Sequence, residues 1–420
     1  MDYIGLPKRN IIAIDMKSFY ATCECIDRKL DPYTTPLVVA EPNRNGAMTL
    51  AVTPYMKSLG IKGRTRIYEI PSNIKFITAP PRMDYYIKMS KEVVSIYQEY
   101  VDIKDIHIYS IDECFLDVTD YLRLYKKTDY ELALEIMNKI KRKTGLISTC
   151  GIGPNLLIAK VAMDIEAKHT KDNIAKWTYE DIESKFWPIT PLSKFWGIGA
   201  RMEKNLNDMG LYKIGDIAVY DKAKLKKKFG IIGEELYEHA NGIDYSRISD
   251  FNRRPKEQSY GHSQVLYKDY NEDNIKLIIR EMIDVLTARL RRHNKKATII
   301  GFGLSYSKTY GGGFYHSKKI GRPTNDGKYI YEIILSMLER FCEDYPIRKV
   351  SINLAGLVDN NIEQLNLFEN YEKVEEKENI NKAIDDIKDK YGKNSILKAS
   401  SLLKDSTAKE RNKKIGGHRA

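Results

Sequence analysis

The stretch IHIYSIDECF, residues 106–115, places two acids, Asp112 and Glu113, in a segment whose composition is typical of β-strands. IHIY and CFLDV are predicted to form two strands separated only by residues 110–113, so the acids lie at a hairpin turn or at a strand end. Two neighbouring carboxylates are costly inside a sheet unless something compensates for their charge. The arrangement raises the question of what compensates for it.

A third acid, Asp15, ends another predicted strand. Residues 11–15, IIAID, form a β-branched run, and a helical pattern follows from Ser18, an N-cap candidate, to about Arg28. The predicted strand therefore ends at Asp15, just before the start of a helix. If it is a neighbour of the strands within 106–118, three carboxylates converge at one edge of the sheet.

Such a cluster of acids repels itself unless a cation lies within it. Oxygen ligands on rigid strand ends suit Mg²⁺, and the backbone carbonyl of Met16 is a candidate further ligand. Two such ions about 3.5–4 Å apart can hold the attacking and the leaving oxygen of a phosphoryl transfer. An alternative needs no metal: Asp112 caps the hairpin turn through its own backbone, and Glu113 is solvated. Spacing alone leaves both interpretations open.

The composition narrows the class of protein. A chain of 420 residues and 48.5 kDa predicts roughly two to four domains. No apolar run approaches the roughly 18 residues of a membrane span, no signal segment is visible, and the five cysteines follow no disulfide or zinc pattern. We therefore expect a protein of the reducing cytoplasm with no membrane partner. The excess of 69 basic over 57 acidic residues favours a polyanionic partner such as nucleic acid.

The order of elements predicts three folded parts. Short strands and helices alternate up to about residue 174, which favours an α+β sheet covered by helices on one face. Helices dominate from 175 to 244. Four strands and two helices are then predicted between 259 and 357. The polar remainder is periodic only at 380–391, so we expect a largely flexible tail.

Four motifs, in order along the chain, resemble those of the Y-family translesion DNA polymerases, and look closest to the bacterial UmuC-like branch. The resemblance extends over about residues 10–360, which makes it far more specific than any one motif. The motifs are AIDMKSFYATCE (13–24), YSIDECFLDVT (109–119), GIGPNLLIAKVAMDIEAK (151–168) and FWGIGARMEKNL (195–206).

The resemblance implies an α+β multidomain fold, that of a right-hand polymerase. Its parts are a ferredoxin-like palm, small fingers, a helical thumb with a helix-hairpin-helix, and an α/β little-finger domain. The implied boundaries are 1–26 and 84–174 for the palm, 27–83 for the fingers, 175–244 for the thumb, 250–358 for the little finger, and 359–420 for a C-terminal tail with a clamp-binding peptide.

The implied activity is that of a template-directed, low-fidelity DNA polymerase, a nucleotidyltransferase that inserts nucleotides opposite damaged template bases. Asp15, Asp112 and Glu113 would be the catalytic acids. Together with the carbonyl of Met16 they would hold two Mg²⁺ ions, with Glu113 nearer the primer 3′-hydroxyl.

The resemblance also implies a nucleotide site formed by Phe19, Tyr20, Lys57 and Lys168. Tyr20, five residues after Asp15, falls at the steric gate, where an aromatic ring under the sugar excludes a ribose 2′-hydroxyl. Phe19 is assigned to packing beside it. Both lysines would contact the triphosphate.

Two features of the triphosphate site depart from the family pattern. Relatives usually use a tyrosine and an arginine three residues apart, which align with Pro54 and Lys57, while Tyr55 is one position off. Lys57 keeps the charge but lacks the bidentate fork of arginine. The spacing to Lys168 is one residue longer than in many relatives.

Lys160 and Lys168 are predicted to lie on one helix, with Asp164 midway between them at i+4 from each. A surface ion-pair ladder is therefore an alternative to a catalytic role for Lys160.

Contacts to DNA are expected from the thumb. The segment WGIGARMEKNLNDMG (196–210) resembles a helix-hairpin-helix, in which Gly197, Gly199 and Arg201 would approach a backbone phosphate at a helix start. In the tail, EQLNLFEN (363–370) resembles the peptide by which bacterial polymerases bind the sliding clamp. The matching residues are Gln364, Leu365, Leu367 and Phe368.

The expected partners are primer-template DNA, deoxynucleoside triphosphates, the clamp and an activator of the SOS damage response, bound by a monomeric enzyme. Two other functions fit parts of the sequence. One is a palm-fold nucleotidyl cyclase, although the Gly-Gly-acid loop of diguanylate cyclases is missing. The other is a catalytically weak accessory protein that binds DNA and the clamp, which the altered Pro54 and Lys57 would suit.

Overall fold

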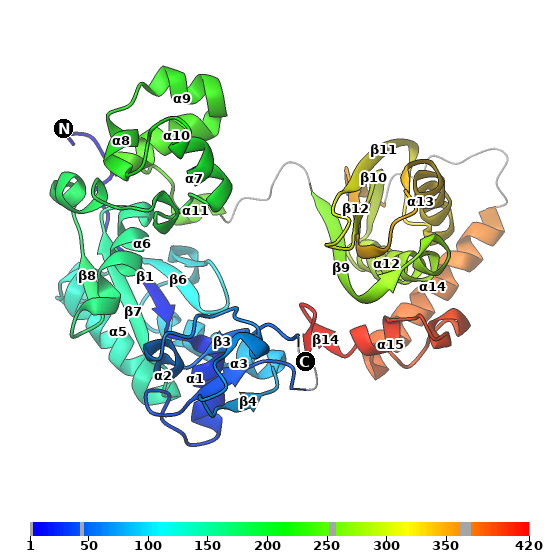
Figure 1. Ribbon diagram of the computed structural model, residues 1–420, viewed down its shortest axis with the longest axis horizontal. Helices are drawn as coiled ribbons and strands as arrows, with labels where there is room; N and C mark the ends of the chain where they lie inside the picture. Colours follow the sequence, from blue (N-terminus) through cyan, green and yellow to red (C-terminus); the bar gives the residue numbers. More distant parts are fainter. Residues whose placement is uncertain (1–2, 43–45, 252–257, 361–370, 420) are drawn as a thin grey trace. The chain divides into compact units, whose positions relative to one another are not determined.

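The computed structural model describes residues 3–42, 46–251, 258–360 and 371–419. They form two compact units, which comprise residues 1–253 and 254–420 (Figure 1). Among the described residues, no helix has both the length and the apolar character needed to cross a membrane.

A five-stranded sheet organises the first unit. Its strands are antiparallel to their neighbours except for the last pair, which is parallel. In spatial order they are β5 (Ile106–Ile108), β6 (Glu113–Asp117), β1 (Ile11–Met16), β7 (Ser148–Gly153) and β8 (Ile174–Lys176). The strands predicted at 106–118 and at 11–15 are therefore neighbours in this sheet.

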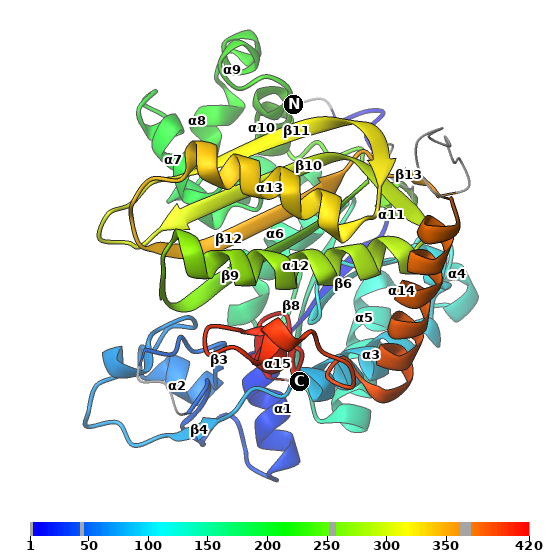
Figure 2. The same cartoon turned by 90° about the vertical axis from the view of Figure 1, so that its right-hand side faces the viewer.

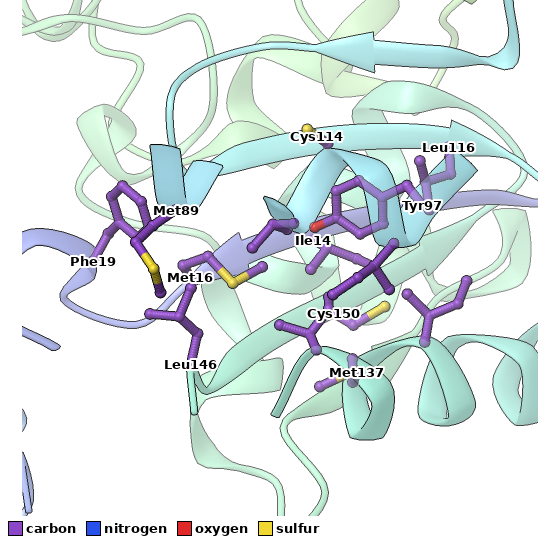
Figure 3. Close-up of a cluster of buried hydrophobic side chains, with 14 of the residues drawn as sticks. Ile14, Met16, Phe19, Met89, Tyr97, Cys114, Leu116, Met137, Leu146 and Cys150 are labelled. Carbon is purple, nitrogen blue, oxygen red and sulfur yellow. The ribbon is translucent and has the colours of Figure 1, made fainter. Parts of the chain in front are cut away.

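The larger core lies between this sheet and two helices, α3 (Met83–Gln98) and α5 (Asp129–Thr144). Ile14 pairs with Cys114 on one side and Cys150 on the other, so the three side chains face the helices together (Figure 3). The buried ring of Tyr97 and the side chain of Met137 pack over them. Alternate residues of β1 therefore belong to this core, and the residues between them face the other way.

The opposite face of the sheet is covered by α6 (Leu156–Ile165), so the prediction of helices on one face only is wrong. The reason is the presence of glycine at two positions of β7 that face α6, Gly151 and Gly153. A Cβ added to Gly151 would lie 1.9 Å from the backbone oxygen of Ala159, and one added to Gly153 would lie 2.6 Å from its nitrogen. The two glycines allow the helix backbone to approach the strand directly.

A small three-stranded sheet follows the first helix of the chain, α1 (Phe19–Asp27). Ser18 precedes α1 as predicted, but its side chain makes no capping hydrogen bond, since its backbone is left-handed with φ 50° rather than extended. The elements here are β2 (Leu37–Val39), β3 (Ala51–Val52), α2 (Pro54–Ser58), η1 (Ile67–Glu69) and β4 (Ile77–Ala79).

The remainder of the first unit is mostly helical, as predicted. Its core contains Trp177 and Phe186 and also Leu157, Ile158 and Val161 of α6, so α6 is buried between the sheet and this helical part. The elements are η4 (Tyr179–Asp181), η5 (Ile182–Phe186), η6 (Leu192–Lys194), α7 (Ala200–Asn207), α8 (Ile214–Ala218), α9 (Lys222–Phe229), α10 (Ile231–Ala240) and α11 (Ile248–Phe251).

The second unit is an antiparallel sheet with two long helices, α12 (Glu272–Arg292) and α13 (Gly327–Phe341), side by side across one face (Figure 2). Four strands and two helices are what the sequence predicts. The spatial order is β11 (Gly313–Thr324), β10 (Lys295–Tyr306), β12 (Ile347–Ala355) and β9 (Ser259–Tyr270), and β13 (Val358–Asp359) pairs with the start of β10.

The prediction of a largely flexible tail is wrong for residues 371–419, which fold against the second unit. Helix α14 (Tyr371–Tyr391) is joined to α12 by the ion pair of Arg291 with Asp385, 2.7 Å. Further along, the carboxylate of Glu281, which is 4% exposed, accepts hydrogen bonds from Ser406 and Thr407. These contacts are polar, so apolar periodicity could not reveal them. The other tail elements are η7 (Ala399–Leu402), α15 (Ala408–Arg411), β14 (Lys414–Ile415) and β15 (His418–Arg419).

Candidate active site

The pairing of β1 with β6 brings the three predicted acids to one edge of the sheet. Asp15 lies directly opposite Glu113 in the antiparallel ladder, so their side chains leave the same face. The backbone amide of Met16 donates to the carbonyl of Asp112 at 3.0 Å, which holds the loop before β6 against the end of β1.

The protonation of Asp15 is altered by this arrangement. Burial, followed by the negative charges of Asp112 and Glu113, raises the pKa of Asp15 from 3.8 to about 7, although Lys168 and Lys160 oppose the rise. The three carboxylates are therefore close enough to repel one another.

Part of the compensation for these charges comes from α6. The ammonium of Lys160 lies 2.8 Å from Oε1 of Glu113 and 3.1 Å from Oδ2 of Asp164, and the side chains of Lys160 and Glu113 are only 10% and 9% exposed. The predicted ladder of ion pairs therefore exists at Lys160, but it is buried and extends to the sheet. Burial nevertheless outweighs Lys160, and the pKa of Glu113 is raised.

Lys168 does not share a helix with Lys160, contrary to the prediction, because α6 ends at Ile165. Lys168 belongs to the separate 3₁₀ turn η3 (Ala167–His169), where its side chain is about half exposed and its ammonium lies 3.4 Å from Asp164. It can therefore exchange Asp164 for another anion more easily than Lys160 can.

Asp112 is oriented by its own turn. The hydroxyl of Ser110 donates to Oδ1 of Asp112 at 2.6 Å, and the amide of Asp112 donates back to that hydroxyl at 3.3 Å. The serine thus organises the turn and leaves the second carboxylate oxygen of Asp112 for another partner.

The donor set can be tested against a divalent cation. In the part of the chain that the structure describes, no three His, Cys, Asp or Glu side chains already converge as a metal site. Asp15 and Asp112, with the backbone carbonyl of Met16, nevertheless supply hard oxygen donors, and burial together with the neighbouring carboxylates raises the pKa of Asp15. These donors fit a hard divalent cation, while Glu113 is held by Lys160.

Two further lysines lie close enough to the acids to interact with them. Burial lowers the pKa of Lys57, on α2, and the positive charge of Lys168 lowers it further. Pro54 occupies the first turn of α2, where its missing N–H is tolerated.

Lys17 is a candidate that the sequence analysis missed. Its pKa is lowered by burial, by Lys168 and by Lys57, so it belongs to the same group of charges, and its ammonium donates to the side chain of Asn173. The only signal in the sequence is its place two residues after Asp15.

Tyr20 projects from the first turn of α1 toward the same edge. Its pKa is raised by burial and then by the charge of Asp112, and its ring lies 4.6 Å from that of Tyr86 between centroids. Phe19 is 2% exposed and packs in the main core, near Met89 (Figure 3). Tyr20, not Phe19, is therefore the aromatic side chain available to a ligand.

The Gly-x-Gly turn leads into α7 as predicted. Gly197 has φ 92°, which favours glycine, and Gly199 is the N-cap residue of α7. No atom lies within 4 Å of a Cβ added at either glycine, so the helix start is open, and Arg201 is exposed beside it. The clamp-peptide residues lie outside the described part of the chain: Gln364, Leu365, Leu367 and Phe368.

Three family models match successive parts of the chain. Residues 14–164 match the impB/mucB/samB family, residues 194–244 match a thumb domain described as that of DNA polymerase-iota, and residues 257–367 match the C-terminal domain of the impB/mucB/samB family. A Bacillus subtilis protein named "Putative UV-damage repair protein UvrX" is 40% identical over the whole length of both chains. The chain belongs to the Y-family translesion DNA polymerases.

Further relatives and a solved structure carry the names of DNA polymerases. A Bacillus subtilis protein named DNA polymerase IV 2 is 34% identical over 98% of this chain and 99% of its own, and a DNA polymerase IV of Pelotomaculum thermopropionicum is 30% identical over 96% and 97%. A solved structure named "Y-family DNA polymerase chimera Dbh-Dpo4(243-245)-Dbh" shares the fold with a TM-score of 0.66, at 21% identity, covering 84% of this chain and 100% of that one.

Y-family membership makes the chain a DNA-directed DNA polymerase of translesion synthesis. It also implies binding of primer-template DNA and use of a divalent metal. The nucleotidyl cyclase and the catalytically weak accessory protein are not favoured by these relatives.

The raised pKa of Asp15 predicts an unusual pH dependence of stability in the metal-free polymerase. Between about pH 4 and 7 the folded state keeps a proton on Asp15 that the unfolded state has lost, so the free energy of unfolding falls as the pH rises, by up to about 4 kcal/mol. Asp15→Asn should remove this contribution. Urea denaturation of both forms at several pH values, with a chelator present, measures the difference; parallel curves would contradict the assignment.

Proposed function

We propose that the polymerase inserts nucleotides, at low fidelity and opposite damaged template bases, at the edge of the palm sheet formed by Asp15, Asp112 and Glu113. The observation that carries this proposal is the pairing of Asp15 with Glu113, with Lys57 and Lys168 close enough to alter the protonation of the site. Clustered carboxylates can bind a cation and the lysines beside them can bind an anion, so together they suit a metal-bound triphosphate.

Each protein group then has a separate task. Asp15, Asp112, Glu113 and the carbonyl of Met16 would hold two Mg²⁺ ions, and Ser110 orients Asp112 for this purpose. When bound, the ions neutralise the triphosphate and lower the pKa of the primer 3′-hydroxyl. Glu113, held by Lys160, would lie nearer the primer end.

The lysines would bind the triphosphate. Lys57 and Lys168, joined by Lys17, supply positive charge beside the acids without the directional fork of an arginine. The incoming phosphates would replace Asp164 as the partner of Lys168, because that side chain is exposed and its present ion pair is long.

The sugar and the duplex are recognised elsewhere. Tyr20 would serve as the steric gate beneath the sugar, while the open start of α7, with Gly197, Gly199 and Arg201, would hold a phosphate of the duplex without reading its sequence. Exposed lysines and arginines of the second unit would add salt-dependent contacts to the backbone.

We further propose that the polymerase works as a monomer in the bacterial cytoplasm and is recruited by the sliding clamp through Gln364, Leu365, Leu367 and Phe368. A tether of this kind raises the local concentration of the enzyme at a primer end. An activator of the damage response completes the proposed set of partners.

Replacing Asp112 and Glu113 together by alanine should lower primer extension at least about 10³-fold, because two of the proposed metal ligands are lost, one of them the acid nearer the primer end. Single-turnover extension on intact and lesion-bearing templates measures this effect. Asp120→Ala, an exposed acid beyond β6, is the matched control. Unchanged extension by the double variant would disprove the assignment of the site.

Tyr20→Ala should increase the use of ribonucleotides relative to deoxyribonucleotides by about 10²-fold, because the ring that excludes the 2′-hydroxyl is removed. The measurement is the ratio of kcat/KM for a matched pair of nucleotides opposite the same template base. If sugar selectivity stays the same, Tyr20 is not the gate.

Alanine at Leu367 and Phe368 should abolish the stimulation of primer extension by a bacterial sliding clamp, since apolar anchors dominate such small interfaces. The ratio of extension with and without the clamp gives the effect. Tyr391→Ala, which removes an exposed aromatic ring from α14, serves as the control. Equal stimulation of all forms would exclude this peptide as the clamp ligand.

A further inference from the structure

A buried carboxylate lies one helical turn beyond Tyr20 and takes no part in the chemistry proposed above. Glu24 is 0% exposed. It receives two hydrogen bonds from Arg82, both at 2.9 Å, one from Nε to Oε1 and one from Nη2 to Oε2. Arg28 forms a further ion pair with it from the same helix. Glu24 is thus a fully paired charge inside the protein.

The next partner of Glu24 leads back to the proposed gate. The hydroxyl of Tyr86 donates to Oε1 of Glu24 at 2.7 Å, and the ring of Tyr86 is completely buried. That ring lies 4.6 Å from the ring of Tyr20, at an interplanar angle of 34°, and 6.5 Å from Phe19 in an edge-on contact. Tyr86 therefore connects the buried carboxylate to the back of Tyr20.

A buried ion pair of this kind adds little to stability compared with apolar residues of the same size, because both charges lose their hydration. What it does provide is geometry. The two parallel hydrogen bonds of Arg82, which precedes α3, fix the Glu24 carboxylate in one orientation. Glu24 in turn fixes the Tyr86 hydroxyl and hence the position of the ring.

We propose that Glu24, oriented by Arg82, is a positioning residue for sugar selection that acts on Tyr20 through Tyr86. The inference rests on the proposed role of Tyr20 as steric gate. A gate works only if its ring cannot move away from the extra hydroxyl of a ribose. Tyr20 itself is partly exposed, so its resistance to movement depends on the rings packed against it, of which the ring of Tyr86 is nearer than that of Phe19.

The matched test removes one oxygen atom. Tyr86→Phe keeps the ring but loses its bond to Glu24, which should raise ribonucleotide use relative to deoxyribonucleotide use about tenfold, near the lower end of the effect of a hydrogen bond to a charged group. The control is Tyr100→Phe, which removes a hydroxyl that donates to the carboxylate of Glu135 at 3.1 Å. That change should leave the ratio as it is.

The full-length polymerase is assayed in all forms by the ratio of kcat/KM for the two sugars, with melting temperatures recorded in parallel. Glu24→Gln is the second test variant. It keeps an acceptor for the Tyr86 hydroxyl but weakens the interaction with Arg82, so it should relax sugar selectivity as well.

The outcomes separate this inference from the gate itself. A relaxed ratio in Tyr86→Phe, with Tyr100→Phe unchanged, supports it. If Tyr20→Ala relaxes selectivity and Tyr86→Phe does not, the gate stands and the positioning role is wrong. If both nucleotides lose efficiency equally and the melting temperature falls, Glu24 and Tyr86 are only structural, and the inference is also wrong. If even Tyr20→Ala has no effect, both proposals fail.

Discussion

The register between β1 and β6 is the constraint on which the cluster of acids in this polymerase depends. It sets Asp15 opposite Glu113 and Ile14 opposite Cys114. Because side chains alternate along a strand, a slip of one residue would carry the acids into the core and the apolar residues out of it. The burial of Ile14, Met16 and Cys114 against α3 and α5 therefore holds the register, and the meeting of the acids follows from it.

That meeting creates a local excess of negative charge, which the protein compensates only in part. Lys160 reaches Glu113 from α6, and Lys17, Lys57 and Lys168 stand nearby, yet the pKa of Asp15 remains about 7. Under the proposed function, the site would require a cation and a polyanion that bind together. A site neutralised by the protein alone would have no such requirement.

Helix α6 connects the chemistry to the rest of the first unit. Its residues Leu156 to Met163 are all buried, some against the sheet and some against the helical part that carries the Gly-x-Gly turn. Its one lysine holds Glu113. Gly151 and Gly153 permit α6 to approach the sheet closely, and this approach brings Lys160 within reach of Glu113.

The sequence by itself determined the acids, the strands and helices that carry them, and the family, because these depend on local composition and on the order of motifs. It could not determine which face α6 covers, where α6 ends, that Lys160 is buried, that Lys17 belongs to the site, or that the polar tail folds onto the second unit. Those features depend on contacts between residues far apart in the chain, such as Glu24 with Arg82 and Arg291 with Asp385. A charged side chain looks the same in a sequence whether it meets water or a partner, and only the tertiary structure decides which of the two it meets.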